Sequence, residues 1–383
     1  MRQSRLLAEL DRRMRACPDD VAWARDMCRA ASQLGRQGHA ELSLEAIHHV
    51  RRHYGSRLHA EVACWLMLAE GVLHYFHLQY DHARDRTSRA HALAVALRVA
   101  PARPSCAAWL AAMDFNDDRL ESMVDRLEEA LSLAAPDDHQ ALARATLVMA
   151  DALHHCGHYA EARPWYDRSR HHAAIEGDQA ALSALMHNMA AFRAAQIRLA
   201  DAFEPGCTPR DLHLASVEAD SVQRYDLAIG TRSFHMLIPL LQAQLLTVGQ
   251  RFVEALRVFD AIEGAAIPTK LGATAEADRA WCLASLGRVA DARFSARRTL
   301  ALMPQTPEAD EQAHVLARLS SIERRIGEAF LPDTRTRARQ ALARHRRSQR
   351  ALHQRLRELR VRLAHRMPVP ISAAPSDSPR RSA

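Results

Sequence analysis

Residues 147–169, with the sequence LVMADALHHCGHYAEARPWYDRS, read as two helices joined by a tight turn. Gly157 lies at the centre, and glycine readily adopts the left-handed conformation that ends a helix. Ala150 and Ala162 lie on either side of the turn, where small residues allow two antiparallel helices to cross closely. These features together predict a helical hairpin.

The same spacing of small residues recurs along the chain. Segments 71–83, 243–255 and 280–292 each place two small residues twelve positions apart around an expected turn. Successive anchors are separated by 40, 40, 39, 40, 53 and 37 residues, so five of the six steps are similar. The pattern therefore predicts a series of hairpins. The anchors are Ala31, Gly71, Ala111, Ala150, Ala190, Ala243 and Ala280.

This pattern resembles the tetratricopeptide repeat, a helix–turn–helix unit with small residues on both helices and glycine at the turn. The period of this chain, near forty, is longer than that of the family. The resemblance implies an all-α fold, a right-handed α-solenoid of about seven hairpins followed by a long C-terminal helix. We expect the repeats to occupy residues 20–331, with a capping helix in residues 1–19 and an insertion loop at about 199–210, where two prolines and a glycine occur.

The composition favours helices and an intracellular protein. Apolar residues make up 48% of the 383 residues but aromatic residues only 5%, a mixture that suits helices better than strands. The seven cysteines are scattered without a Cys-x-x-Cys pair, as expected of reduced thiols. The N-terminus lacks the apolar core of a secretion signal, and no stretch is long and apolar enough to span a membrane. We expect a cytoplasmic protein.

The basic charge is concentrated near the C-terminus. The net charge of the chain is +7, and residues 333–367 contain twelve arginines against two acidic residues. We expect residues 332–367 to form one helix capped by Asp333, and the Pro/Ser-rich residues 368–383 to be disordered. The arginines lack interleaved aromatic residues for base stacking, so nucleic-acid binding is not the favoured function.

Four leucines of this helix follow a heptad spacing, which predicts either a dimer or a cap. In the first case two copies of the chain pair through the leucines, and the helix relays the binding of a ligand to a partner protein. In the second case the helix docks on the end of the repeats as a cap. Repeat proteins need such a cap because the last repeat would otherwise expose its apolar face. The leucines are Leu352, Leu356, Leu359 and Leu363.

The run LRELRVRLAHRM, residues 356–367, resembles the signalling helix that joins sensor modules to diguanylate cyclase domains. The cyclase motifs that follow such a helix in that family are missing from this sequence. The resemblance implies a sensor or regulatory module of a signalling protein that lacks its output domain. It is an alternative to a bacterial-type signalling adaptor that binds a protein or peptide.

The tetratricopeptide resemblance also implies a concave groove for a protein or peptide partner, lined by the first helix of each hairpin. An equally plausible role for Trp65 and Tyr75 is packing between neighbouring repeats. Carrying the register of the family onto this chain gives the groove positions Trp65, Leu68, Val72, Tyr75, Phe76, Asn116, Arg144, Asp151, His155 and His187.

No enzyme, metal or cofactor site is predicted. His154, His155 and His158 surround one turn, but they do not follow the paired spacing typical of zinc ligands, so surface histidines are expected. The sequence has no glycine-rich phosphate loop and no nucleophile elbow. The expected protein is therefore a non-enzymatic binding scaffold.

Overall fold

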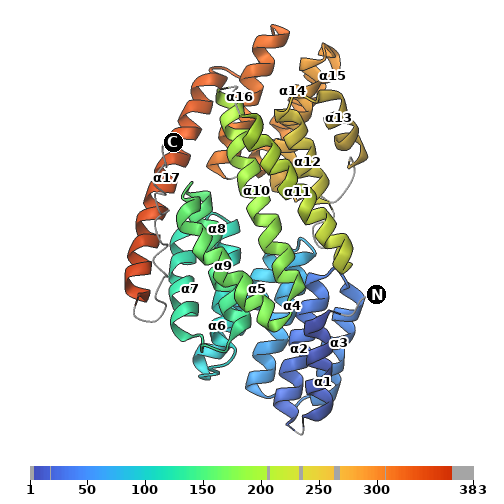
Figure 1. Cartoon of the computed structure of the whole chain (residues 1–383), viewed down its shortest axis with the longest axis vertical. Coiled ribbons are helices and arrows are strands. Elements are labelled where there is room, and N and C mark those ends of the chain that lie inside the picture. The colour runs from blue at the N-terminus through green and yellow to red at the C-terminus, as the bar shows by residue number, and fades with distance from the viewer. Residues whose placement is uncertain are drawn as a thin grey trace, which may run out of the picture.

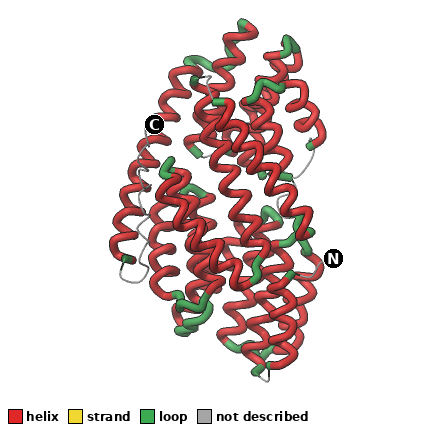
Figure 2. Tube along the Cα trace, in the orientation of Figure 1, coloured by secondary structure: helices red, strands yellow, loops and turns green. Residues whose placement is uncertain are grey.

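The computed structural model describes residues 4–17, 19–204, 208–232, 236–262, 268–306 and 308–364, and within them the chain is all-helical (Figure 2). Short loops join consecutive helices. A 3₁₀ turn at Met303–Gln305 follows α15. The α-helices are α1 (Arg5–Ala16), α2 (Asp20–Arg36), α3 (Ala40–Tyr54), α4 (Ala60–Phe76), α5 (Tyr80–Ala96), α6 (Arg103–Asn116), α7 (Leu120–Leu133), α8 (His139–His155), α9 (Tyr159–Glu176), α10 (Gln179–Phe203), α11 (Pro209–Ile229), α12 (Leu237–Val248), α13 (Phe252–Ala261), α14 (Thr269–Ser285), α15 (Val289–Leu302), α16 (Ala309–Ile326) and α17 (Thr334–Leu363).

Consecutive helices pair as antiparallel hairpins, most closely α4 with α5, α6 with α7, α8 with α9 and α14 with α15. The predicted hairpin of residues 147–169 is confirmed as α8, a turn at Gly157, and α9. The same left-handed conformation recurs at the turns of other hairpins. Some of these turns have no glycine, and there the conformation costs the residue about 1–2 kcal/mol. It is adopted by Gly38, Leu78, Asp118, Gly157, Gln250 and Gly287.

The small-residue anchors lie buried where paired helices cross. Ala111, Ala150 and Ala280 are fully buried. A Cβ atom added to Gly71 would come within 2.3 Å of the Thr87 hydroxyl, so α4 and α5 approach too closely there for any larger residue. Small residues therefore set the separation of the two helices in each pair, as their spacing in the sequence indicates.

The predicted insertion loop at about 199–210 is mostly helical. α10 continues to Phe203, and α11 begins at Pro209, which suits the first turn of a helix because its missing N–H is not needed there. The expectation of a loop from residue 199 is therefore wrong. α10 is long because it packs against α8, α12 and α16, and it runs through the middle of the molecule in Figure 1.

The long C-terminal helix was predicted, and α17 packs along its own chain (Figure 1). It leaves α16 and runs back against α7 and α8. The first residue of α17, Thr334, donates a hydrogen bond from its hydroxyl to Glu323 at 2.8 Å. Asp333, which precedes it, makes no capping hydrogen bond, so the predicted cap is wrong. The residues of the predicted tail, 368–383, lie outside the described part of the chain.

The leucines of α17 are buried within the chain. Leu352, Leu356, Leu359 and Leu363 belong to the same apolar cluster as residues of α7 and α8. In this structure they are therefore occupied and cannot also form the predicted dimer seam. Docking was the alternative expectation: the first half of α17 packs on α16 at the end of the series, and the half that carries the leucines covers the flank of α7 and α8.

Polar contacts join helices that are far apart in the sequence. Arg36 of α2 pairs with Asp178 before α10 at 2.7 Å. The backbone N–H of Arg232 donates to the carbonyl oxygen of Gln37 at 3.1 Å. These links bring the first hairpin against the later ones. Among the described residues, no helix combines the length and the apolar character that a membrane crossing requires.

Candidate functional site

The interior contains two adjoining cavities of about 240 Å³ and about 290 Å³. They share Asn116, His187, Leu237 and Leu271, and together they are called the interior cavity below. Their walls come mainly from the even-numbered helices α4 to α16, the first helix of each hairpin, with α17 closing one side. Helices that are far apart in the sequence thus contribute to a single concave site.

Seven of the ten predicted groove positions lie on the wall of the interior cavity. Leu68 and Val72 do not, because they are buried in the apolar core between α2, α4 and α6. Trp65 lies in the same core, and its indole N–H donates to Glu61 at 3.4 Å. α4 is apolar on most of its circumference, so only its last turn is left to face the cavity. The wall residues are Tyr75, Phe76, Asn116, Arg144, Asp151, His155 and His187.

Arg144 provides an unmatched positive charge on this wall. Its guanidinium lies 4.0 Å from the ring centre of Trp109, a favourable cation–π contact. It makes no hydrogen bond or ion pair with any other residue in the described ranges, and Asp178 and Asp151 act on its charge only at longer range. Burial, and then the nearby charge of Arg36, lower the pKa of Arg144 to about 10, so it remains protonated at neutral pH. An anionic group that entered the cavity would find a free cation there.

Aromatic residues form one end of the cavity. Tyr75 contacts Phe76, Tyr80 and Trp109 edge-on, with ring centres 5.4 Å, 5.6 Å and 5.9 Å away. The amide of Asn116 donates a hydrogen bond to the Tyr75 hydroxyl and so fixes its orientation. Such rigid aromatic groups can bury the apolar part of a ligand with little loss of conformational freedom.

Asp151 lies at the floor of the cavity without a cation bonded to it. The Tyr166 hydroxyl donates to one carboxylate oxygen at 2.9 Å, and the Asn188 amide donates to the other at 2.7 Å. Burial raises the pKa of Asp151 to about 7, although these two hydrogen bonds and the charge of Arg144 oppose the shift. The carboxyl group therefore changes its charge near neutral pH.

Lys270, the only lysine of the chain, also contributes to the cavity, which its sequence position did not indicate. Its ammonium group donates to the carbonyl oxygen of Asn116 at 2.9 Å and pairs with Glu308 at 3.3 Å. Lys270 lines the cavity from the first turn of α14. Its bonding partner is 154 residues away, so no local pattern could have indicated the contact.

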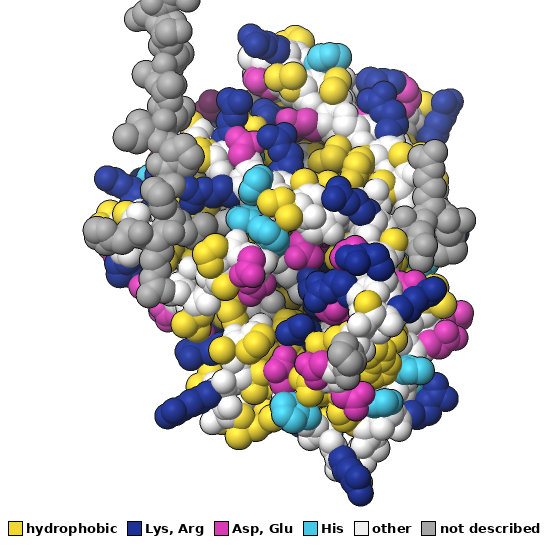
Figure 3. Space-filling model, turned by 60° about the horizontal axis from the view of Figure 1, so that its bottom comes forward, with side chains coloured by type: hydrophobic (Ala, Val, Ile, Leu, Met, Phe, Trp, Pro, Cys, Tyr) yellow, Lys and Arg dark blue, Asp and Glu magenta, His cyan; other side chains and the backbone are white. Residues whose placement is uncertain are grey.

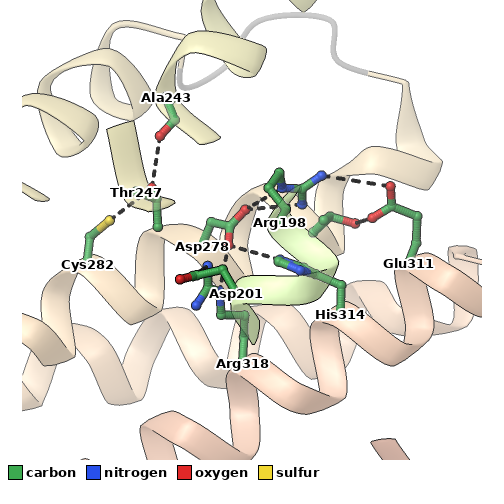
Figure 4. Close-up of polar contacts among 10 residues, drawn as sticks. Arg198, Asp201, Ala243, Thr247, Asp278, Cys282, Glu311, His314 and Arg318 are labelled. Carbon is green, nitrogen blue, oxygen red and sulfur yellow. Dashed lines mark hydrogen bonds and ion pairs between the residues drawn. The ribbon is translucent and has the colours of Figure 1, made fainter. Parts of the chain in front are cut away.

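Behind one wall of the cavity, buried ion pairs join α10, α14 and α16 (Figure 4). Asp278 accepts hydrogen bonds from Arg198 at 3.2 Å, Arg318 at 3.1 Å and His314 at 2.9 Å. Burial opposes a charge on Asp278, yet His314 and the two guanidinium groups lower its pKa well below the ordinary value. Arg318 also pairs with Asp201 at 2.8 Å. This network positions the helices that carry the cavity wall.

Two groups of histidine and carboxylate side chains lie where α17 meets the turn between α8 and α9. No local spacing predicted them, because their members come from distant parts of the sequence. The expectation that the histidines around this turn are ordinary surface residues is wrong for His154, which is buried and accepts or donates a hydrogen bond with Tyr166 at 3.2 Å.

No protein-family model matches the chain, and a search of curated proteins found no match to it. The class that its structure defines is an all-helical protein built of paired antiparallel helices with a long C-terminal helix.

Proposed function

We propose that this chain is a non-enzymatic scaffold of the tetratricopeptide type, a right-handed solenoid that binds a segment of a partner protein in its interior cavity. The observation that carries the proposal is that seven positions expected to contact a ligand lie on the wall of one cavity. Left-handed turns recurring about every forty residues, at Gly38, Leu78, Asp118 and Gly157, support the repeat assignment.

The chemistry of the cavity indicates what kind of segment it accepts. Arg144 supplies a free guanidinium, which favours a carboxylate, and Tyr75 and Phe76 supply apolar surface beside it. A hydrogen bond to a charged group contributes about 1.5–3 kcal/mol, and only a few such anchors usually carry the binding energy. A short segment with an acidic residue next to an apolar one fits this wall. Enclosure by α17 favours a few residues over a long extended peptide.

A second candidate is a sensor or regulatory module that has lost its output domain. The observation that favours it is that α17 contributes His345 and Gln349 to the same cavity. A ligand that touches these residues would change how firmly α17 docks, and α17 would then report occupancy. This role is compatible with the scaffold proposal, since both place the ligand in the interior cavity.

Nucleic-acid binding through α17 is the least supported of the three functions. Arg355, Arg360 and Arg362 pair with Glu121, Glu161 and Glu128 of the same chain, which neutralises part of the basic charge. Figure 3 shows Lys and Arg side chains interspersed with acidic and apolar ones on the face that it presents. A phosphate backbone binds more strongly where the basic groups are free.

The test is selection of short random peptides displayed on phage against the full-length protein, followed by affinity measurements on the synthesised peptides. We expect the enriched peptides to carry an acidic residue. The substitution Arg144→Met should weaken binding by about tenfold or more, equivalent to about 1.4 kcal/mol, because it removes the charge but keeps most of the volume. Arg347→Met is the matched control, since Arg347 is exposed and makes no contact among the described residues. Equal binding by the two variants, or no enrichment, would contradict the proposal.

A further inference from the structure

His155, Asp310 and His345 converge at the edge of the interior cavity, although they come from three helices. His155 ends α8, Asp310 lies in the first turn of α16, and His345 lies on α17. Each offers one nitrogen or oxygen atom, and these atoms all lie within 4.8 Å of one another. No local motif links residues so far apart, so the cluster is a product of the fold.

None of these three side chains makes a hydrogen bond or ion pair with any other residue in the described ranges. This sets them apart from other polar groups at the cavity. Glu311, the neighbour of Asp310, accepts a hydrogen bond from Thr274 at 2.8 Å. Polar groups in partly buried surroundings are normally paired, and an unpaired set of three is available to bind a ligand.

The surroundings suit a metal cation. Phe115 and Phe192 contact the His155 ring edge-on, with 5.8 Å and 6.2 Å between ring centres, and supply apolar surface beside the cluster. The two imidazoles of the cluster also lie edge to face, with 5.3 Å between ring centres. The carbonyl oxygen of His155 accepts a hydrogen bond from Gln349 of α17 at 2.5 Å, which holds the two helices together beside the cluster.

The charges near the cluster are mostly negative. Burial lowers the pKa of His345, Asp310 opposes that shift, and the charges of His155 and the exposed Arg346 add to it. Asp118, at the turn between α6 and α7, lies close enough for its pKa to be affected by both His155 and Asp310, although burial is the main cause of its raised value. The carboxylates of Asp310 and Asp118 and the two imidazoles of the cluster are side chains of the kinds that bind divalent cations.

We infer that His155, Asp310 and His345 form a binding site for a divalent transition-metal cation, for which Zn²⁺ is the best match. Two imidazoles and one carboxylate are the set of three protein ligands found in open zinc sites, where a water or ligand atom takes the fourth position. Zinc–ligand bonds of about 2.0–2.2 Å require the three atoms to approach each other by about 1 Å, which side-chain rotation supplies. The fourth position faces the interior cavity.

The second cluster, His158, Glu161 and His353, lacks the properties that support the first. Its carboxylate is already engaged by His353 at 3.0 Å and by the guanidinium of Arg360. The two imidazoles are stacked, with ring centres 3.5 Å apart and planes 12° from parallel. A bound cation would have to displace Arg360. This cluster therefore serves as an ion pair that fastens α17 to α9, and it provides a matched control.

A metal at the first cluster would fasten α17 to both α8 and α16. Because metal ligands from three helices come together only in the folded chain, the bound ion stabilises the docked position of α17. This inference goes beyond the proposed peptide binding, and it is tested without any peptide.

The experiment is equilibrium dialysis of Zn²⁺ against the full-length protein, purified without a polyhistidine tag and stripped with a chelator. We expect one equivalent to bind, the unfolding temperature to rise, and Co²⁺ to give the intense visible absorption of a four-coordinate site. Asp310→Asn should fold normally, since Asp310 has no partner to lose, and His345→Ala provides a second variant. Both should lose more affinity than the roughly tenfold to hundredfold that loss of an outer-shell partner costs.

The controls are His353→Ala in the second cluster and His48→Ala at an exposed position. Both should bind Zn²⁺ as the unmodified protein does. The inference is overturned if no stoichiometric binding is found, if Asp310→Asn and His345→Ala both bind normally, or if His353→Ala abolishes binding. If Zn²⁺ binding fails while the metal-free protein still binds peptide, this inference falls and the proposed function stands.

Discussion

Two buried aspartates of this protein carry different charges at neutral pH because the helices around them supply different partners. Asp278, where α10, α14 and α16 meet, contacts Arg198 and Arg318. Asp151, where α8, α9 and α10 meet, accepts hydrogen bonds from the Tyr166 hydroxyl and from a side-chain amide. Both side chains are almost completely buried.

Burial by itself therefore does not decide the charge of a carboxyl group. Burial opposes the charge at both sites, and His314 together with two guanidinium groups outweighs it only at Asp278. At Asp151 the two neutral donors do not compensate for burial, and the pKa rises to about 7. The first region is therefore held together by charges, whereas the second is mainly apolar and bonds Asp151 through neutral donors.

The largest effect is expected from breaking the charged region. Asp278→Ala leaves Arg198 and Arg318 buried without their shared partner, and loss of one member of a buried ion pair costs about 3–5 kcal/mol. Chemical denaturation should show this decrease in the free energy of unfolding. Asp167→Ala, which removes an exposed pair with Arg170, should change it by less than about 1 kcal/mol. Similar costs for the two variants would mean that the network is not what holds α10, α14 and α16 together.

The apolar region should respond next to the loss of a leucine of α17. Leu356 is fully buried, and replacement of a buried leucine by alanine costs about 2–5 kcal/mol, with the lower half of that range expected because α17 can readjust at the surface. Hydrogen exchange of the α17 amides should accelerate at the same time. Val361→Ala is the control, since Val361 is 74% exposed and its loss should be nearly neutral. Unchanged exchange in the Leu356 variant would argue against docking through the leucines.

The effect of neutralising Asp151 is spread over several pH units and is the smallest of the three per pH unit. Its pKa is about 7 in the folded chain and 3.8 in its ordinary state, so between these values the folded chain retains a proton that the unfolded chain releases. The free energy of unfolding therefore decreases as pH rises through this window and is constant above it, with a slope of at most about 1.4 kcal/mol per pH unit. Asp151→Asn should remove this contribution. Denaturation of both proteins across and above the window measures it, and identical pH profiles would show that Asp151 does not titrate there.

The hairpins of the fold could be predicted because their signals are local. Ala150, Gly157 and Ala162 lie within one turn and its flanking helices, and their sizes determine how closely the helices cross. The turns at Leu78 and Gln250 adopt the same left-handed conformation without glycine, so only the spacing of the neighbouring small residues indicated them. The end of α10 was misjudged, because packing against α16 extends that helix to Phe203.

The candidate site could be predicted only in part. The helical register places Tyr75, Arg144 and Asp151 on the cavity wall, since one face of the first helix in each hairpin turns inward. The roles of Lys270 and His345 were missed, because each acts on helices more than a hundred residues away. The heptad spacing of the α17 leucines indicated that they would be buried, but not which helices would bury them.

That this protein is made of paired helices follows from its residues alone, because helix propensity, turn geometry and the size of crossing residues act over a few positions. The docking of α17 on α7 and α8, the interior cavity and the pairing of the charged groups within it follow only from how the chain folds in three dimensions. Those outcomes depend on distances between helices far apart in the chain. The effects of burial and charge depend on distances in space, and the order of residues along the chain does not give those distances directly.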